Sequence, residues 1–219
     1  MIPRLDATRR LVLLRHGRTA WNLEGRAQGH ADVPLDEVGH AQAAATATQL
    51  AELQPVALWS SDLARARQTA SYVETATGLA ATLDPRLREY DVGIRAGLTL
   101  AELADKHPEE HAAWLRTRSW DVVPGAETAA EVSHRVVAAL RGCLAALAPG
   151  ETGIVVAHGA CLKVSLLTLL GLPLEADRAI GHLDNCGWAS VAEHHDGHLR
   201  LTSYNQTAPT GDEAPAGTP

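Results

Sequence analysis

Two short apolar runs that each end in a His-Gly pair constrain this chain most strongly. Residues 11–17 are LVLLRHG and residues 154–159 are IVVAHG. Short apolar runs of this kind are typical of buried strands in a parallel sheet. If the two strands are neighbours, His16 and His158 emerge at the same carboxyl edge, which is where such sheets bind ligands. One strand-end histidine is more often structural than catalytic, but a pair in matching contexts favours a functional site.

Around these runs, candidate strands alternate with candidate helices. This alternation predicts an α/β fold with a mostly parallel central sheet flanked by helices. Steps of three and four between apolar residues from Val132 to Leu147 predict an amphipathic helix there. We expect strands over 11–14, 56–60, 79–83 and 154–157; helices over 37–53 (capped by Asp36), 63–77 (capped by Ser61 or Asp62) and 160–170; a helix from Thr99 that Pro108 interrupts; and loops over 20–34 and 85–98.

The C-terminal part predicts a β-hairpin followed by a tail. The runs Trp188–His194 and Leu199–Tyr204 flank an Asp-Gly pair, which is a strong signal for a tight hairpin turn. From Gln206 the sequence is QTAPTGDEAPAGTP, which has no apolar periodicity. We therefore expect one domain over residues 1–205 and a disordered tail over 206–219.

Composition argues against several classes of protein. The 219 residues carry a net charge of −7, whereas nucleic-acid binders normally present a basic face. The first ten residues, MIPRLDATRR, lack the apolar core of a signal peptide, and no apolar run approaches the roughly 20 residues that span a bilayer. Three cysteines without metal-ligand spacing favour a reducing compartment. We expect a soluble cytoplasmic protein that binds neither nucleic acid nor membrane, although a local arginine cluster can still attract a small anion.

Three stretches together resemble a known family. LRHGRTAWN near the N-terminus, SSDLARARQTA in the middle and VVAHG late in the chain are similar to the histidine phosphatase superfamily, which includes the cofactor-dependent phosphoglycerate mutases. The resemblance implies a mainly parallel sheet flanked by helices. It also implies chemistry through a phosphohistidine, which it assigns to His16. A neutral imidazole suits this role because its ordinary pKa of about 6.5 leaves it nucleophilic near pH 7.

The resemblance also implies which groups bind the phosphoryl group. Arg15 and Arg65 match the arginines that hold its oxygens, and guanidinium groups offer bidentate donors that never deprotonate. His158 is implied as a further donor, and Asn22 matches the polar residue that ends the first motif. The backbone N–H groups of Gly159-Ala160 lie at a helix start, where anions bind. Taken alone, each residue also has an ordinary structural interpretation.

Expulsion of an alkoxide requires a proton donor, and a positioned general acid typically contributes about 10²–10⁴-fold. The stretch RLREYDVG offers Glu89 and Asp91. The family pattern favours Glu89, which would protonate the leaving oxygen and then activate the water that hydrolyses phospho-His16. Asp91 is better interpreted as a turn or surface residue.

Two stretches depart from the family pattern. Many members follow the acid with a Gly-x-Trp-Glu-Gly-like segment, whereas this chain has Gly-Ile-Arg-Ala-Gly over residues 93–97. Arg95 could meet a second anionic group on the substrate or face solvent, and the sequence leaves both open. The segment PGAET (124–128) has Ala126 where a second glycine is usual. These changes put the substrate in doubt rather than the phosphoryl transfer.

The stretch after the first motif favours the phosphatase branch of the family over the mutases. It contains Gln28-Gly29, with Gln28 as a candidate substrate-binding residue, and no long insertion over the site. A phosphatase must admit water to the phosphohistidine, while a mutase must exclude it. Phosphatases acting on glucosyl-3-phosphoglycerate have a similar layout, including Asn185–Trp188. The function we predict is therefore hydrolysis of a small phosphorylated metabolite, with a phosphoglycerate mutase or a non-catalytic phospholigand-binding protein as alternatives.

No metal or cofactor is expected. His194, His195 and His198 surround the hairpin turn, where side chains usually point into water, so a metal site there is the weaker hypothesis. His107 and His111 have helical spacing that Pro108 compromises, and Cys161 is better interpreted as a small buried side chain than as a nucleophile. A homodimer stays open.

Overall fold

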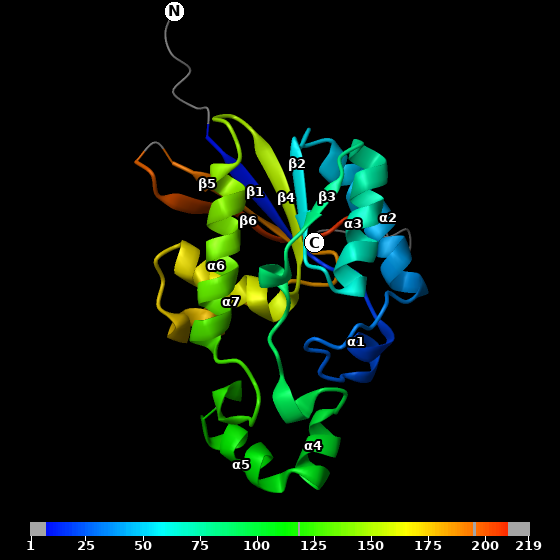
Figure 1. Ribbon diagram of the computed structural model, residues 1–219, viewed down its shortest axis with the longest axis vertical. Helices are drawn as coiled ribbons and strands as arrows, with labels where there is room; N and C mark the ends of the chain where they lie inside the picture. The colour runs from blue at the N-terminus through cyan, green and yellow to red at the C-terminus, as the bar shows by residue number, and fades with distance from the viewer. Residues whose placement is uncertain (1–7, 118, 195, 210–219) are drawn as a thin grey trace, which may run out of the picture.

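The computed structural model of the protein describes residues 8–117, 119–194 and 196–209. Its centre is a six-stranded sheet in the order β3-β2-β4-β1-β5-β6 (Figure 1). The first four strands run parallel, and β5 and β6 are added antiparallel at one side. The predicted α/β fold with a mostly parallel sheet and a C-terminal hairpin is confirmed. The strands are β1 (Arg10–Arg15), β2 (Ala57–Ser60), β3 (Ala81–Leu83), β4 (Thr152–Ala157), β5 (Trp188–Glu193) and β6 (Leu199–Gln206).

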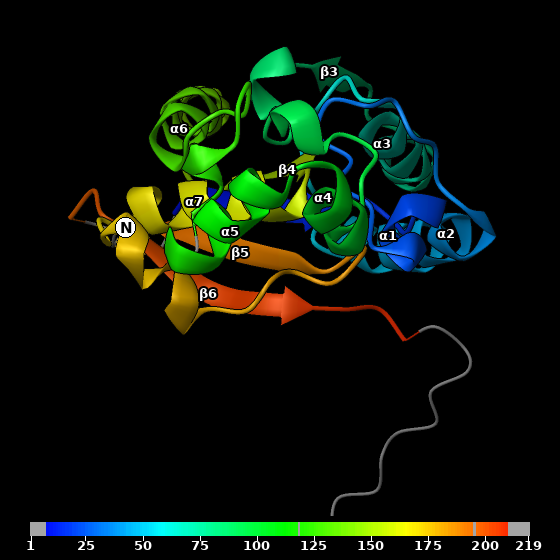
Figure 2. The same cartoon turned by 90° about the horizontal axis from the view of Figure 1, so that it is seen from below.

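The central strands β1 and β4 are buried on both faces, which explains their continuous apolar sequences. Leu11 and Leu13 pack against helices α6 and α7, whereas Val12 and Leu14 pack against α2 and α3. Figure 2 shows these helices on either side of the sheet. The helices are α1 (Ala20–Glu24), α2 (Glu37–Ala51), α3 (Ala64–Thr77), α4 (Leu100–Lys106), α5 (Pro108–Thr117), α6 (Ala129–Ala145) and α7 (Gly159–Leu169), with 3-10 turns η1 (Pro85–Leu87), η2 (Gly93–Arg95), η3 (Trp120–Val122) and η4 (Leu174–Ala179).

Most helix ends follow the local signals in the sequence. Thr99 and Thr128 form capping boxes at the starts of α4 and α6, and Gly78 ends α3 in the left-handed conformation. The predicted cap of α3 is wrong: Leu63 occupies the N-cap position, without a side-chain hydrogen bond. Asp32, which comes from a distant loop, accepts from the Ala64 N–H instead.

Three predicted boundaries also need correction. The expected loop over 20–34 contains helix α1, because Thr19 and Asn22 form a capping box at its start. The expected loop over 85–98 contains η1 and η2. Gln206 belongs to β6, where it pairs with Trp188, and not to a tail. The predicted disorder of residues 210–219 lies outside the described residues.

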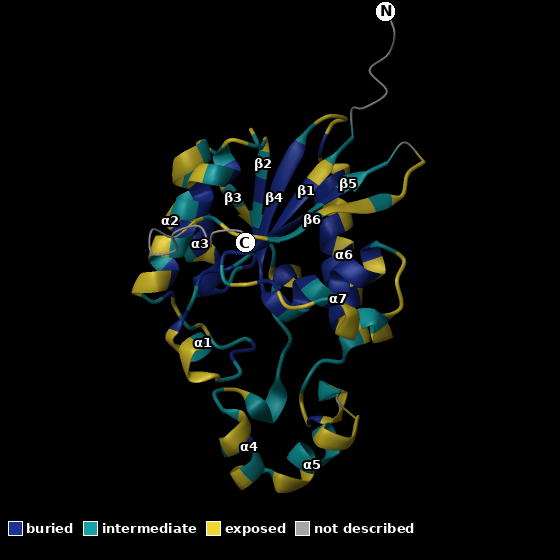
Figure 3. Ribbon diagram, turned by 180° about the vertical axis from the view of Figure 1, so that it is seen from behind, coloured by how far each residue is buried: buried dark blue, intermediate teal, exposed yellow. Residues whose placement is uncertain are grey.

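Helices α4 and α5 project beyond the carboxyl ends of the parallel strands (Figure 1). Figure 3 shows that α4 and α5 are mostly exposed or half-buried, in contrast to β1 and β4. None of the helices in the described part of the chain combines the length and the apolar character that crossing a membrane requires.

Candidate active site

The two His-Gly motifs meet at the carboxyl edge of the sheet. Strands β1 and β4 are parallel neighbours, with Arg15 opposite Ala157 in the register. His16 and His158 follow them directly, and their ring centroids lie 5.2 Å apart at an interplanar angle of 60°. The predicted juxtaposition of the two imidazoles is therefore present in the structure.

His16 has one ring nitrogen anchored and the other left for chemistry. Its Nδ1 lies 2.7 Å from the carbonyl oxygen of Gly17, and a carbonyl only accepts hydrogen bonds, so Nδ1 carries the proton. The lone pair is then on Nε2. Burial, followed by the charges of Arg65 and Arg15, holds the pKa of His16 well below its ordinary value. The ring is therefore neutral and nucleophilic at physiological pH.

Arg65 enters the site from the first turn of α3 and is only 1% exposed. Its Nε donates to Nδ1 of His158 at 3.1 Å, and its Nη atoms donate to the carbonyls of Ala31 and Gly29. Since Nδ1 of His158 accepts, its Nε2 carries the proton and donates to Ser61 Oγ at 2.9 Å. Ser61, predicted as a helix cap, instead orients this imidazole.

Arg15 lies at the end of β1 against the first residue of α7. A Cβ at Gly159 would lie 3.2 Å from both Cδ and Nε of Arg15, so the missing side chain lets the guanidinium pack closely there. Nη1 donates to the carbonyl of Leu183 at 2.5 Å. Nε is buried and has no hydrogen-bond partner among the described residues.

The site is electropositive. Burial lowers the pKa of Arg65 to about 10 and lowers that of Arg15, but both guanidinium groups stay charged at neutral pH. Burial and the same charges hold the pKa of His158 well below its ordinary value. The buried Arg65 and the half-buried Arg15, beside two neutral imidazoles, form a strong local field for an anion.

Glu89 completes the edge from the chain segment that follows η1. Its carboxylate accepts from the N–H groups of Ala160 (3.0 Å) and Cys161 (2.8 Å) at the start of α7. These two N–H groups fix the position of the Glu89 carboxyl group at the start of the helix. The Ala160 N–H, predicted to bind the ligand, is therefore occupied by Glu89 in this structure.

Asn22 and Gln28 lie at the margin of this group. Asn22 Oδ1 accepts from Thr19, which stabilises α1, and from Asn185 Nδ2 at 3.3 Å. Asn185 also donates to the backbone carbonyl of His16 at 3.2 Å, a contact that sequence reasoning missed. Gln28 is 9% exposed, and its Oε1 is buried without a hydrogen-bond partner among the described residues.

The residues that were left open or set aside have clear positions. Asp91 accepts from the Gly93 N–H within a turn, as expected. Arg95 places its guanidinium carbon 3.1 Å from the ring centroid of Trp120, which in turn stacks on Trp114 at 4.6 Å. Burial raises the pKa of the Cys161 thiol well above its ordinary value, which disfavours a thiolate nucleophile.

No group of three or more His, Cys, Asp or Glu side chains placed to hold a metal ion occurs within residues 8–117, 119–194 and 196–209. His194 pairs with Asp196 at 3.0 Å across the hairpin turn. His195, the middle residue of the candidate histidine cluster, lies outside the described residues.

The chain is similar to known proteins along nearly its whole length. The profile of the histidine phosphatase superfamily (branch 1) matches residues 11–207. Over 193 residues the chain is 36% identical to the glucosyl-3-phosphoglycerate phosphatase of Mycobacterium tuberculosis, covering 85% of this chain and 86% of that protein. Over 181 residues it is 36% identical to the probable phosphoglycerate mutase GpmB of Escherichia fergusonii, covering 83% of each.

Solved structures agree with the sequence comparisons. The mycobacterial glucosyl-3-phosphoglycerate phosphatase in complex with VO3 superposes with a TM-score of 0.82 at 35% identity, covering 91% of this chain and 100% of that one. A putative alpha-ribazole-5'-P phosphatase from Escherichia coli gives a TM-score of 0.82 at 27% identity, covering 91% and 97%. The chain therefore belongs to the histidine phosphatase superfamily, branch 1.

Proposed function

We propose that the protein is a metal-independent phosphomonoesterase that works through a phosphohistidine on His16. The observation that carries this proposal is the meeting of two neutral imidazoles with the buried guanidinium of Arg65 and the half-buried guanidinium of Arg15 at one sheet edge. A neutral nucleophile beside fixed positive charge is what attack on a phosphate dianion requires.

In the first step, the lone pair on Nε2 of His16 attacks phosphorus. The N–P bond forms as the bond to the ester oxygen breaks, and the leaving oxygen takes a proton from the protonated carboxyl group of Glu89. Arg15 and Arg65 stabilise the charge on the three equatorial oxygens. His158 is oriented by Arg65 and Ser61 to serve as a further donor once phosphate displaces its present partner.

In the second step, water hydrolyses phospho-His16. Glu89, now a carboxylate, takes a proton from the attacking water, and the P–N bond breaks to release inorganic phosphate. The same carboxyl group thus gives and regains one proton per turnover, and His16 returns to its neutral form. No metal ion takes part in either step.

We propose glucosyl-3-phosphoglycerate as the substrate. Two observations support it: the 36% identity to the phosphatase named for this compound, and a second cation, Arg95, on the segment that follows Glu89. The substrate carries a carboxylate besides its phosphate, and Arg95 has no acidic partner among the described residues. Identity of 36% to a probable phosphoglycerate mutase keeps phosphoglycerate mutation as the second candidate.

A panel of phosphorylated metabolites, ranked by kcat/KM with and without EDTA, tests this function. We expect glucosyl-3-phosphoglycerate to rank first and EDTA to have no effect. Conversion of 3-phosphoglycerate to 2-phosphoglycerate faster than phosphate release would favour the mutase. Loss of activity with EDTA would overturn the metal-independent mechanism. No turnover of p-nitrophenyl phosphate between about pH 5 and 8 would favour a binding protein instead.

A further inference from the structure

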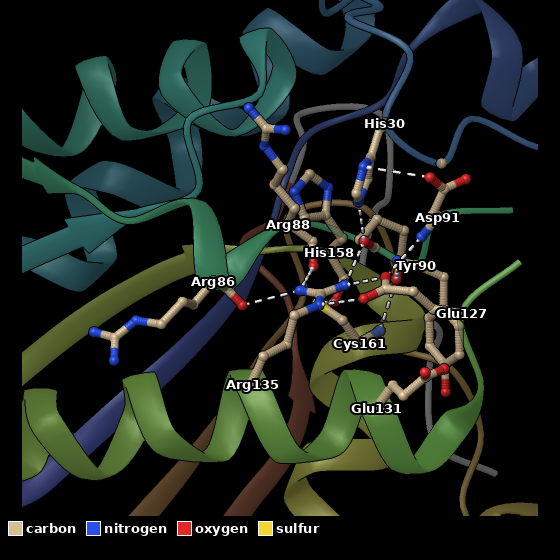
Figure 4. Close-up of polar contacts among 12 residues, drawn as sticks. His30, Arg86, Arg88, Tyr90, Asp91, Glu127, Glu131, Arg135, His158 and Cys161 are labelled. Carbon is tan, nitrogen blue, oxygen red and sulfur yellow. Dashed lines mark hydrogen bonds and ion pairs between the residues drawn. The ribbon is translucent and has the colours of Figure 1, made fainter.

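One guanidinium ties the segment that carries Glu89 to helix α6. Arg135 donates from Nη1 to the carbonyls of Arg86 (2.9 Å) and Arg88 (2.7 Å), and from Nη2 to the carbonyl of Glu89 (2.7 Å). Figure 4 shows the Arg135 side chain reaching from α6 into this segment. Three carbonyls within four consecutive residues are thus held by one side chain.

Glu127 holds that guanidinium from the other side. Its Oε1 accepts from Arg135 Nε at 2.8 Å and its Oε2 from Nη2 at 2.7 Å, which is a bidentate pair. Glu127 Oε2 also accepts from the backbone N–H of Asp91, and the Glu127 N–H donates to the Asp91 carbonyl. The role of the PGAET segment, which the sequence left open, is therefore to anchor Arg135 and residues 89–91 together.

Glu89 is consequently fixed from two helices. Its backbone carbonyl is held by Arg135 on α6 and contacted by His30 Nε2 at 2.9 Å. Its carboxylate is held by the first N–H groups of α7. A proton donor must be held within about 0.5 Å of its productive position, and a displacement of about 1 Å can cost roughly 10²-fold in rate.

We propose that Arg135, anchored by Glu127, is a positioning residue that sets the geometry of the general acid Glu89. This inference rests on the proposed phosphatase mechanism. Arg135 reaches the backbone of Glu89 and not its carboxylate, so it would act on proton transfer only through Glu89. A lysine cannot replace it, because one ammonium cannot span three carbonyls and a bidentate carboxylate at once.

Kinetics of Arg135→Lys test this role, with Arg141→Lys as the matched control. Arg141 lies on the same helix and is exposed. We expect kcat of Arg135→Lys on an alkyl phosphate to fall about 10–100-fold with KM unchanged. The loss on p-nitrophenyl phosphate should be smaller, because that leaving group needs no acid. In a Glu89→Gln background, Arg135→Lys should have no further effect. Equal losses on both substrates, or additive losses, would overturn the proposal.

Hydrogen exchange gives a readout that does not depend on activity. The amides of Ala160 and Cys161 donate to the Glu89 carboxylate, so loss of positioning should speed their exchange. We expect faster exchange in Arg135→Lys and Glu127→Gln, and no change in Arg141→Lys. Unchanged exchange in the first two variants would refute the positioning role of Arg135, even if the wild-type chain proved inactive. Inactivity of the wild-type chain on every phosphomonoester would instead refute the proposed function.

Discussion

The strand edge and the lobe beyond it are built in opposite ways. At the strand edge, His16, Arg65 and His158 are buried and Arg15 is half-buried, and hydrogen bonds fix each of these four side chains. The lobe, residues 93–117 and 119–123, is mostly exposed or half-buried (Figure 3). Its contacts include stacking interactions, with Arg95 on Trp120 and Trp120 on Trp114, and an ion pair between Glu102 and Arg26.

This difference suggests that separate regions of the protein set the reaction and the choice of substrate. Four residues that match the family motifs, Arg15, His16, Arg65 and His158, lie at the strand edge, where hydrogen bonds hold their side chains. Both departures from the family pattern lie in or beside the lobe, and they touch each other: Val92 bridges to Ala126, and a Cβ at Gly93 would collide with the carbonyl of Pro124. We infer that the strand edge sets the reaction and the lobe sets which ester is admitted.

The largest expected effect is the loss of the proposed nucleophile, His16, at the strand edge. His16→Ala removes the proposed phosphoryl acceptor, so turnover should stop. A phosphorylated substrate should label the wild-type chain with an acid-labile phosphate and leave the variant unlabelled. His134→Ala, which changes an exposed histidine on α6, is the control and should label normally. Labelling of His16→Ala would show that the phosphoryl acceptor lies elsewhere.

Glu89→Gln should have the next largest effect, and an unequal one. The amide keeps the shape but cannot give a proton, so hydrolysis of an alkyl phosphate should slow about 10²–10⁴-fold. Hydrolysis of p-nitrophenyl phosphate should slow less, because nitrophenolate leaves without protonation. The ratio of the wild-type rate to the Glu89→Gln rate, measured across a series of leaving groups, tests this difference. A uniform loss would remove Glu89 from the role of acid.

Arg65→Lys tests whether geometry at the strand edge matters beyond charge. The ammonium keeps the charge but cannot reach His158, Gly29 and the ligand together, so kcat/KM should fall about 10²–10³-fold. Arg67 lies two positions along the same helix and is exposed, so Arg67→Lys should leave kcat/KM unchanged. Similar kinetics for the two variants would mean that a point charge suffices at this edge.

The sequence predicted the strand edge because its signals are local. A short apolar run specifies a buried strand, and the residue after it is then placed by the sheet, so His16 and His158 needed no tertiary information. Arg65 followed from a motif match. The sequence did not reveal Ser61 as the partner of His158, because a serine just before a helix is usually an N-cap residue.

Contacts that depend on long-range packing could not be predicted. Asn185 and Arg135 lie far along the chain from the residues they hold, and neither has a spacing that marks it. The use of the Ala160 N–H by Glu89 was missed for the same reason. The sequence also left Arg95 open, because only the fold brings Trp120 beneath its guanidinium.

Acid should destabilise the protein through the strand edge. The folded-state pKa values of His16 and His158 lie below the ordinary 6.5, so the unfolded chain binds more protons as pH falls below that value. Each imidazole then lowers the free energy of unfolding by at most about 1.4 kcal/mol per pH unit. Urea unfolding at a series of pH values measures this. The dependence of the unfolding free energy on pH should be weaker in His16→Asn. An unchanged dependence would contradict the low folded-state pKa of His16.

The smallest expected effect tests the lobe, and it should fall on selectivity alone. Arg95→Ala should lower kcat/KM for a phosphate ester that also bears a carboxylate by about three- to tenfold, because a partly exposed ion pair contributes about 1 kcal/mol. The kcat/KM for p-nitrophenyl phosphate should not change, since that ester has no second anion. Arg116→Ala, exposed on α5 of the same lobe, is the matched control. Equal losses on both esters would mean that Arg95 supports the fold of the lobe and does not bind the substrate carboxylate. The inference that the lobe selects the ester while the strand edge carries out the reaction would then be wrong.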